Sequence, residues 1–210
     1  MYLPKHFEET RPEPLHAFIA AHPLGLLITS DTNGVVVNPI PFLLLPRQGE
    51  QGTLIGHVAR ANPVWRELGQ GGEALVVFQG AQAYISPGWY ASKREHGKVV
   101  PTWNYQTVQA RGTLAVRDDR EAVRAVVHAL TTHHEARQAK PWAMADAPPE
   151  YIEQMLGMII AIELPIRSLV GKMKLSQNRP LADQLGTEAG LAAMGDEAAA
   201  RAMRSLREGR

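Results

Sequence analysis

Residues 105–116 read YQTVQARGTLAV, and they say more about the fold than any other stretch of the chain. Small and apolar residues alternate there with polar ones: Val108, Ala110, Gly112 and Leu114 share one face, and Gln109, Arg111 and Thr113 share the other. Such alternation is typical of a strand that buries one face. It fits the wall of an antiparallel barrel, in which inward and outward residues alternate along every strand.

Other short apolar segments predict further strands. They are residues 24–30, 35–45, 53–58, 74–79 and 82–86, and a last strand over 158–164 that continues past a bulge to 170. Asn33-Gly34 lies between the first two segments and is a strong hairpin signal. Because proline cannot donate to a ladder, Pro39 and Pro41 place the second strand at an edge or at a bulge.

Helices are expected between and after these strands. Apolar spacing, caps and proline boundaries predict residues 15–21, 59–68, 120–136, 150–156 and 180–210, the last with breaks at Gly186 and Gly195. Hairpin-linked strands with inserted and appended helices favour an α+β, mainly β architecture built on a small antiparallel barrel. We expect a barrel domain over residues 1–179 and a helical extension over residues 180–210, packed on that domain or on a dimer partner.

The composition describes an ordinary globular chain. Its 210 residues suffice for one sizeable domain, 45% of them are hydrophobic, and the formal net charge is +1. A dedicated nucleic-acid binder is usually far more basic. The absence of cysteine excludes disulfides, thiolate metal sites and cysteine nucleophiles. Neither a signal-peptide core nor a run of bilayer-spanning length occurs, so we expect a cytoplasmic protein without a membrane partner.

Residues 84–105, YISPGWYASKREHGKVVPTWNY, form the most unusual segment. Five of the chain's nine Trp and Tyr residues lie in it, and it also contains Lys93, Arg94, Lys98 and Asn104. Its prolines and glycines interrupt any regular period, so it is not one helix or one strand. This composition indicates a site for a flat, anionic, hydrogen-bonding ligand. The alternative is a loop that only covers one end of the barrel.

Two other segments are rich in hydrogen-bond donors. GHVARANPVW, residues 56–65, places His57, Arg60 and Asn62 where a strand runs into a helix, and such a corner attracts phosphate. An ordinary strand–helix corner explains these residues equally well. KMKLSQNRP, residues 172–180, is either a second phosphate-binding segment or a solvated turn. In it, Lys174 and Ser176 are expected on the same side of an extended chain.

No set of side chains forms a self-sufficient catalytic apparatus. His133-His134-Glu135 lacks the spacing of metal ligands, because neighbours on a helix do not share a face. Ser86 lacks the G-x-S-x-G turn of a nucleophile. Catalytic residues therefore stay unassigned, and any redox chemistry would need a cofactor.

Over nearly its whole length the chain resembles the PaiB-type FMN-binding negative transcriptional regulators. The segments that carry this likeness are MYLPKHFEE, PLGLLITS, PFLL, GTLIGHVARANPVW, FQGAQAYISPGWYASKREHGKVVPTWNY, the loop from Pro141-Trp142 through Asp146, and GKMKLSQNRP. Several of them are long and unusual in composition. The resemblance implies a split antiparallel β-barrel of the flavin-reductase or pyridoxamine-phosphate-oxidase kind, and a homodimer with FMN at the subunit interface.

The resemblance also implies roles for individual residues. The FMN phosphate is expected at His57, Arg60, Asn62, Lys174, Ser176, Gln177 and Arg179. The isoalloxazine ring is expected against Ile28, Thr29, Trp103 and Asn104, the last two coming from either subunit. Pro39 and Gln109 stand where the family often has histidine. If those histidines touch the flavin, this chain binds FMN differently.

Three functions remain open from the sequence. The first is a homodimeric FMN-binding repressor that senses flavin or redox state. The second is a flavin-dependent oxidoreductase that acts on a small molecule. The third is a dimeric barrel without a cofactor, in which the aromatic loop serves assembly. No helix-turn-helix signature supports direct contact with DNA.

Overall fold

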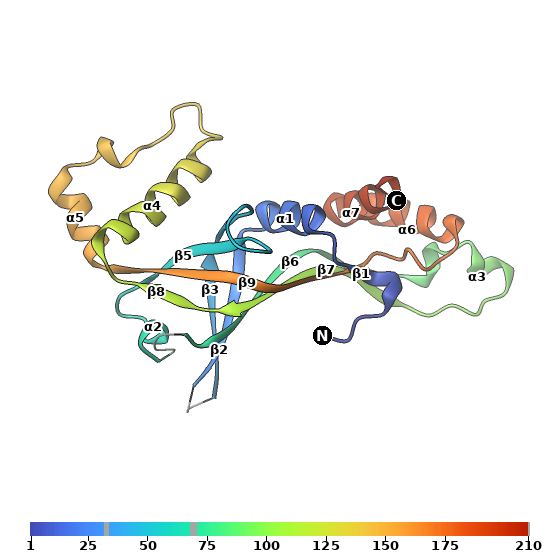
Figure 1. The fold of residues 1–210 in the computed structure, drawn as a ribbon. Helices are drawn as coiled ribbons and strands as arrows, with labels where there is room; N and C mark the ends of the chain where they lie inside the picture. Colours follow the sequence, from blue (N-terminus) through green and yellow to red (C-terminus); the bar gives the residue numbers. More distant parts are fainter. Residues whose placement is uncertain (32–33, 68–70, 210) are drawn as a thin grey trace. The chain divides into compact units, whose positions relative to one another are not determined.

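A computed structural model describes residues 1–31, 34–67 and 71–209, and Figure 1 shows their secondary structure. Within these residues nine strands form one sheet, ordered β3-β2-β6-β7-β9-β5-β4, with β1 and β8 also paired to β9. The strands are β1 (Glu8–Glu9), β2 (Leu24–Asp31), β3 (Gly34–Pro41), β4 (Leu43–Leu45), β5 (Thr53–Ala59), β6 (Glu73–Ile85), β7 (Thr102–Thr113), β8 (Ala115–Arg117) and β9 (Ile159–Lys174). The mainly β architecture predicted from the sequence is confirmed.

Seven α-helices and three short 3₁₀ turns complete the described part of the chain. They are η1 (Lys5–Phe7), α1 (Pro12–Ala21), α2 (Val64–Glu67), η2 (Pro87–Trp89), α3 (Ser92–Glu95), α4 (Arg120–Glu135), η3 (Met144–Asp146), α5 (Pro149–Gly157), α6 (Leu181–Ala193) and α7 (Glu197–Glu208). None of the described helices is long and apolar enough to cross a membrane.

The chain forms two compact units. The first unit contains residues 1–11, 79–108 and 170–210, and the second contains residues 12–78 and 109–169. The strands β6, β7 and β9 each pass from one unit into the other along the chain.

In the second unit, β2 and β3 form the predicted hairpin. Their antiparallel register runs from Leu24↔Pro41 to Asp31↔Gly34. Thr32 and Asn33 of the turn signal lie outside the described residues. β3 stands at one end of the strand order, where Pro39 and Pro41 are tolerated because no neighbour needs their missing N–H groups.

One hydrophobic core cluster of the second unit lies between α4, α5, β5 and β9. Its buried residues are Ile55, Val123, Val126, Leu130, Ile152, Leu156 and Ala161. Asp119 caps α4, because its carboxylate accepts a hydrogen bond from the Ala122 N–H at 2.8 Å. Helices α4 and α5 therefore form where apolar spacing and caps predict them.

One predicted helix of the second unit is much shorter than expected. The sequence predicts a helix over 59–68, whereas β5 continues to Ala59 and α2 contains only Val64–Glu67. Leu68 lies outside the described residues. The Asn62 side chain still caps the short helix, since Oδ1 accepts from the Val64 N–H at 3.0 Å. Pairing of β5 with β9 overrides the helical pattern, because it satisfies the backbone as far as Ala59.

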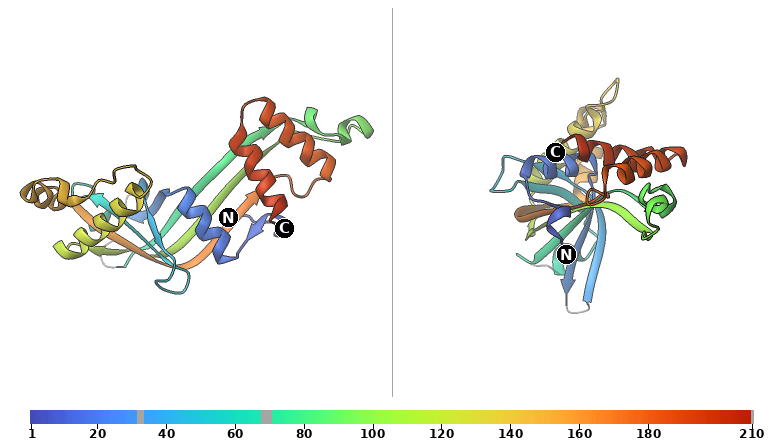
Figure 2. Two further views of the ribbon diagram at one scale, coloured as in Figure 1. Left: turned by 90° about the horizontal axis from the view of Figure 1, so that it is seen from above. Right: turned by 90° about the vertical axis from the view of Figure 1, so that its right-hand side faces the viewer.

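In the first unit, the C-terminal helices α6 and α7 pack over the ends of β6 and β9, and Figure 2 shows these helices side by side. The buried residues there are Ala83, Ile85, Tyr90, Leu175, Leu191, Ala199, Ala200 and Met203. The predicted break at Gly195 is confirmed, because this residue has φ +81 between the two helices.

The predicted break at Gly186 is wrong. Helix α6 runs without interruption from Leu181 to Ala193. An added Cβ would lie 2.1 Å from the Trp89 carbonyl oxygen at Gly186, and 2.4 Å from the Trp89 ring at Gly190. Both glycines are therefore needed for close packing of η2 against the helix, and neither ends it.

β6 also differs from its prediction. The sequence predicts separate strands over 74–79 and 82–86, but β6 is continuous from Glu73 to Ile85. Its burial pattern changes phase instead: Ala74, Val76 and Phe78 are buried, and then Ala83 and Ile85. The change falls at Gly80-Ala81, so the polar residues that follow face outward on a strand that stays paired.

Candidate functional site

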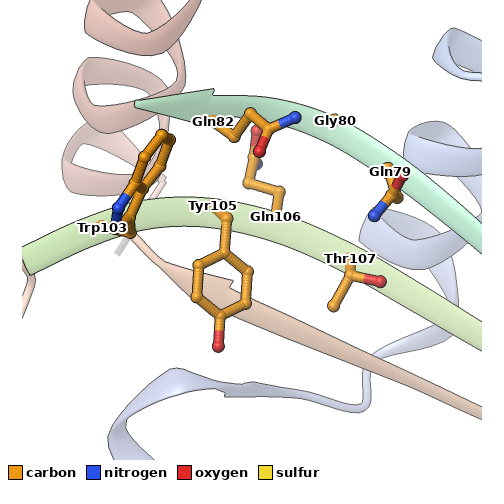
Figure 3. A pocket seen from close by; sticks show the side chains of 7 residues that line it. All are labelled: Gln79, Gly80, Gln82, Trp103, Tyr105, Gln106 and Thr107. Carbon is orange, nitrogen blue, oxygen red and sulfur yellow. The ribbon is translucent and has the colours of Figure 1, made fainter. Parts of the chain in front are cut away.

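The first unit contains a cavity of about 450 Å³ on the exposed side of β6 and β7. Figure 3 shows the residues that line it: Gln79, Gly80 and Gln82 from β6, and Trp103, Tyr105, Gln106 and Thr107 from β7. Its volume lies within the range of small-molecule sites, roughly 300–1,000 Å³. Aromatic and carboxamide side chains thus meet around one hollow.

The aromatic side chains of this region remain largely open to solvent. Trp103 is 53% exposed and Tyr84 is 50% exposed, and their rings meet edge to face at 6.3 Å. Large aromatic side chains are usually buried in a protein interior or an interface. A flat ligand or a second protein surface would cover them.

Two lysines lie close to the cavity on β9. The ammonium groups of Lys172 and Lys174 are 5.4 and 5.9 Å from the centre of the Tyr105 ring. Lys172 donates to the Tyr2 carbonyl at 3.0 Å, and Lys174 donates to Thr102 Oγ1 at 2.6 Å and to the Trp103 carbonyl. Desolvation, followed by the charges of Lys172 and Arg179, lowers the pKa of Lys174. This part of the unit is therefore electropositive.

Asn104 and Ser176 meet, but inside the unit. Ser176 Oγ donates to Asn104 Oδ1 at 3.0 Å, and both side chains are buried. Asn104 Nδ2 also contacts Met203 Sδ at 3.4 Å. The expected shared side of Lys174 and Ser176 is wrong, because β9 ends at Lys174 and Ser176 has φ +62.

Gln177 and Arg179 also make contacts within the first unit. Gln177 Oε1 accepts from the Leu175 N–H at 2.7 Å, and its Nε2 donates to the His6 carbonyl at 3.1 Å. The Arg179 guanidinium lies 4.8 Å from the centre of the Tyr90 ring. The turn after β9 is thus held by contacts within the unit, with Ser176 buried and Asn178 exposed.

In the second unit, Arg60 is held by Asp118, which lies between β8 and α4, and by α5. Its Nη atoms donate to both carboxylate oxygens of Asp118, at 3.1 and 2.5 Å, and its Nε donates to the Gly157 carbonyl at 2.7 Å. The hydrogen bond and charge of Asp118 raise the pKa of Arg60, and Arg60 lowers the pKa of Asp118. A phosphate that binds Arg60 would replace Asp118.

Asn62 and His57 lie at the same corner of the second unit. Asn62 Nδ2 donates to Asn38 Oδ1 at 2.8 Å, and Asn38 Nδ2 is buried without a hydrogen-bond partner. Desolvation lowers the pKa of His57, although its side chain reaches solvent, so the ring is neutral at pH 7. The orphaned Asn38 amide is a donor that an anionic ligand could satisfy.

Ile28 and Thr29 lie on β2 between β3 and β6. Ile28 is half-buried, whereas Thr29 is only 5% exposed. Among the described residues, no group of three or more His, Asp or Glu side chains could hold a metal ion. The aromatic rings, amides and cations described above suit an organic ligand.

A mainly antiparallel sheet with an aromatic, amide-lined cavity is the architecture of a flavin-binding split β-barrel, and the comparisons agree. A family model described as "Putative FMN-binding domain" matches residues 1–168. The chain belongs to this family, and its cofactor is FMN. The resemblance to PaiB-type proteins is confirmed as well. The Bacillus subtilis "Protease synthase and sporulation protein PAI 2" is 30% identical over 185 residues, or 88% of this chain and 86% of the relative.

Solved structures support the same fold. The FAD and heme binding protein from Mycobacterium smegmatis aligns with a TM-score of 0.59 and 21% identity, over 80% of this chain and 73% of that one. The flavocytochrome Anf3 from Azotobacter vinelandii aligns with a TM-score of 0.54 and 15% identity, over 82% and 72%. At these identities the likeness concerns the fold.

The residues present fit FMN. In the first unit, Trp103 offers a planar surface and the glutamine amides offer donors and acceptors, with the lysines on β9 nearby. In the second unit, the orphaned Asn38 amide suits a phosphate ester. Of the cavity residues, sequence reasoning assigned only Trp103 to the flavin. Gln79, Gln82 and Gln106 were missed because single glutamines on a strand carry no motif. The alternation of buried and exposed residues in β6 shifts at Gly80-Ala81, and this shift turns Gln82 outward. In the sequence, the shift looks like a gap between two separate strands.

Proposed function

We propose that the chain is a homodimeric, cytoplasmic FMN-binding regulator of the PaiB type, which represses transcription in response to flavin or redox state. Membership of the FMN-binding family and similarity to the Bacillus subtilis protein support this function. The observation that carries it is the open cavity beside Trp103, which combines half-exposed aromatic rings with amides and nearby lysines.

We assign the cofactor's phosphate to the cationic and amide residues His57, Arg60 and Asn62 of the second unit. When bound, FMN supplies electron transfer, and these residues bind and orient its phosphate. In the first unit, Ser176, Gln177 and Arg179 contact Asn104, His6 and Tyr90 and so fix the chain that follows Lys174.

The flavin ring is assigned to Trp103 in the first unit, with the buried Asn104 next to it on β7. A second copy of the chain would cover exposed aromatic residues such as Tyr84, since patches of this kind mark interfaces. This is the basis for the homodimer, in which Trp103 can serve the flavin of the partner. Helices α6 and α7 form the proposed C-terminal extension.

Flavin binding is tested by titrating the purified protein with FMN while measuring flavin absorbance and Trp fluorescence. We expect one FMN per chain and a dimeric mass by light scattering. Trp103→Leu should weaken FMN binding about tenfold, since stacking on an aromatic side chain contributes about 1–3 kcal/mol per ring. Trp142→Leu is the matched control, because Trp142 is similarly exposed but lies in the second unit on the loop after α4. A colourless monomer that ignores FMN would exclude the proposal.

The regulatory role needs a separate test. Oxidised holoprotein, reduced holoprotein and apoprotein are each used to select duplexes from a randomised DNA pool at two salt concentrations, because specific binding must survive the loss of nonspecific phosphate contacts at higher salt. Enrichment of one sequence by only one redox form supports a redox-sensing repressor. No enrichment, together with turnover of a nicotinamide donor by the holoprotein, would favour a flavin-dependent oxidoreductase.

A further inference from the structure

The cavity of the first unit is lined by three carboxamides. Gln79 and Gln82 come from β6, and Gln106 comes from β7 (Figure 3). Each carboxamide has one acceptor oxygen and two donor hydrogens. Gln106 shares one face of β7 with the buried Asn104 and Val108, and its Nε2 lies 3.6 Å from Sδ of the buried Met173. Gln79 and Gln82 are therefore the carboxamides left for a ligand. The cavity thus offers both donors and acceptors without a charged group in its lining.

This lining matches the pyrimidine edge of a flavin ring. That edge presents a carbonyl, an N–H and a second carbonyl in sequence, so it needs donors on either side of an acceptor. Carboxamides supply either role by rotation of the side chain. Trp103 stands at the same cavity and offers the planar surface that the ring system requires.

The charges next to the cavity are predominantly positive. Lys172 and Lys174 face the Tyr105 ring from β9, and the charge of Arg179 also reaches Lys174. Glu8 on β1 is the residue opposite Lys172 in the sheet, and it is exposed. Within the described part of the chain, neither lysine forms an ion pair with a carboxylate, whereas eight arginine–carboxylate contacts are found. Lys172 is nevertheless only 9% exposed.

A buried ammonium group without a counter-charge is costly. The cost falls if a negative charge arrives with a ligand. Reduction of a flavin by two electrons and one proton places the proton on N5 and leaves a negative charge at N1 and the adjacent carbonyl. That charge lies on the same edge of the ring that the glutamines match.

We propose that the cavity holds the isoalloxazine ring of FMN, with Gln79 and Gln82 on its pyrimidine edge, and that Lys172 and Lys174 favour the reduced, anionic cofactor. The inference rests on the proposed FMN-binding function and deepens it. It assigns to the lysines of β9 a role in setting the redox poise of the regulator. It also places the residues that recognise the flavin ring on the strand pair β6–β7 and not on the loop between these strands.

The lysine effect is tested by titrating the FMN-loaded protein with dithionite and measuring the midpoint potential. Lys172→Met and Lys174→Met should each reduce the preference for reduced over oxidised FMN by about tenfold, as expected for one charge at this range in a partly desolvated site. For a two-electron couple, that is about 30 mV toward lower potential. Lys172→Arg and Lys174→Arg keep the positive charge, so the midpoint potential of these variants should stay close to that of the wild type. Lys98→Met removes an exposed lysine of the same unit and should leave the potential unchanged.

The amide contacts are tested with lumiflavin, which lacks the phosphate tail, and with 3-methyllumiflavin, which also lacks the N3 hydrogen. The wild type should bind lumiflavin at least tenfold more tightly than the methylated ring. Gln79→Leu and Gln82→Leu should reduce this ratio toward one, with unchanged circular dichroism. The inference is overturned, and the proposed function left intact, by either of two results. One is an equal affinity ratio in wild type and variants; the other is a midpoint potential that neither lysine substitution changes while FMN still binds. Failure of the wild type to bind FMN overturns both.

Discussion

Asp183 is the residue by which helix α6 holds the aromatic loop of the first unit. Its carboxylate accepts hydrogen bonds from the Ser92 N–H at 3.0 Å and from Ser92 Oγ at 2.6 Å, and both residues are buried. Trp89 packs against the same helix at Gly186 and Gly190. We predict that Asp183→Ala releases the start of this loop.

The expected loss follows from the two hydrogen bonds. Bonds to a charged acceptor contribute about 1.5–3 kcal/mol, and the variant leaves the buried Ser92 donors unsatisfied. We therefore expect a loss of about 3 kcal/mol in the free energy of unfolding, or roughly 6–12 °C in Tm for a chain of this size. Hydrogen exchange should quicken at Ser92 and its neighbours before it quickens in the core of the second unit.

The assay combines urea unfolding, followed by Trp fluorescence, with hydrogen exchange. Glu197→Ala is the control, because Glu197 is an exposed carboxylate of the same unit, on α7, and should change stability by less than about 0.5 kcal/mol. A double-mutant cycle with Ser92→Ala isolates the pair, since the second substitution should cost little once Asp183 is absent. The reasoning is refuted if Asp183→Ala matches the control, or if the two losses simply add.

Three other predictions follow from the same contacts. Gly190→Ala places a Cβ 2.4 Å from the Trp89 ring, so urea unfolding should show a loss of about 1–3 kcal/mol; an unchanged midpoint would contradict this packing. Asp118 competes with the FMN phosphate for the Arg60 guanidinium. In calorimetry, Asp118→Asn should therefore tighten FMN binding, and Arg60→Met should weaken it. Dissociation constants equal to that of the wild type would exclude Arg60 from the phosphate site. Burial alone would raise the pKa of Asp183, but the Ser92 hydrogen bonds and Arg179 outweigh it and lower the pKa below 3.8. The stability that ionised Asp183 contributes should therefore be complete above pH 3.8 and be lost as the pH falls through the lower pKa of the folded state. Acid unfolding of Asp183→Asn should lack this loss.

Periodic patterns in the sequence predict the sheet well. Along β7 and at Leu114, the residue that follows it, positions 108, 110, 112 and 114 are buried and positions 109, 111 and 113 are not, as their alternation indicates. Helices α4 and α5 also form where caps and apolar spacing place them. These features are local, because each depends on side chains that lie within a few residues of one another.

The candidate site is harder to predict because the same residue types serve binding and packing. Asn104 and Ser176 were assigned to the ligand for their donors, yet the structure buries them against each other. Arg179 was assigned to a phosphate, yet it stacks on Tyr90. Only a partner distant in sequence distinguishes the two roles, and a single sequence does not reveal that partner.

The aromatic loop, residues 84–105, shows the difference between packing and binding most clearly, because Tyr90 near its start is buried and Trp103 near its end is exposed. At its start, Tyr90 is 2% exposed and fixed by the C-terminal helices, so its aromatic character serves packing. At its end, Trp103 is 53% exposed beside the cavity, where no helix covers it in the described structure. Aromatic density in the sequence is therefore a mixture of two signals. A truncation that removes α6 and α7 should loosen the start of the loop, while the glutamines and lysines stay on β6, β7 and β9. Loss of flavin binding in that variant would show that the packed end of the loop, at Tyr90, positions its exposed end, at Trp103.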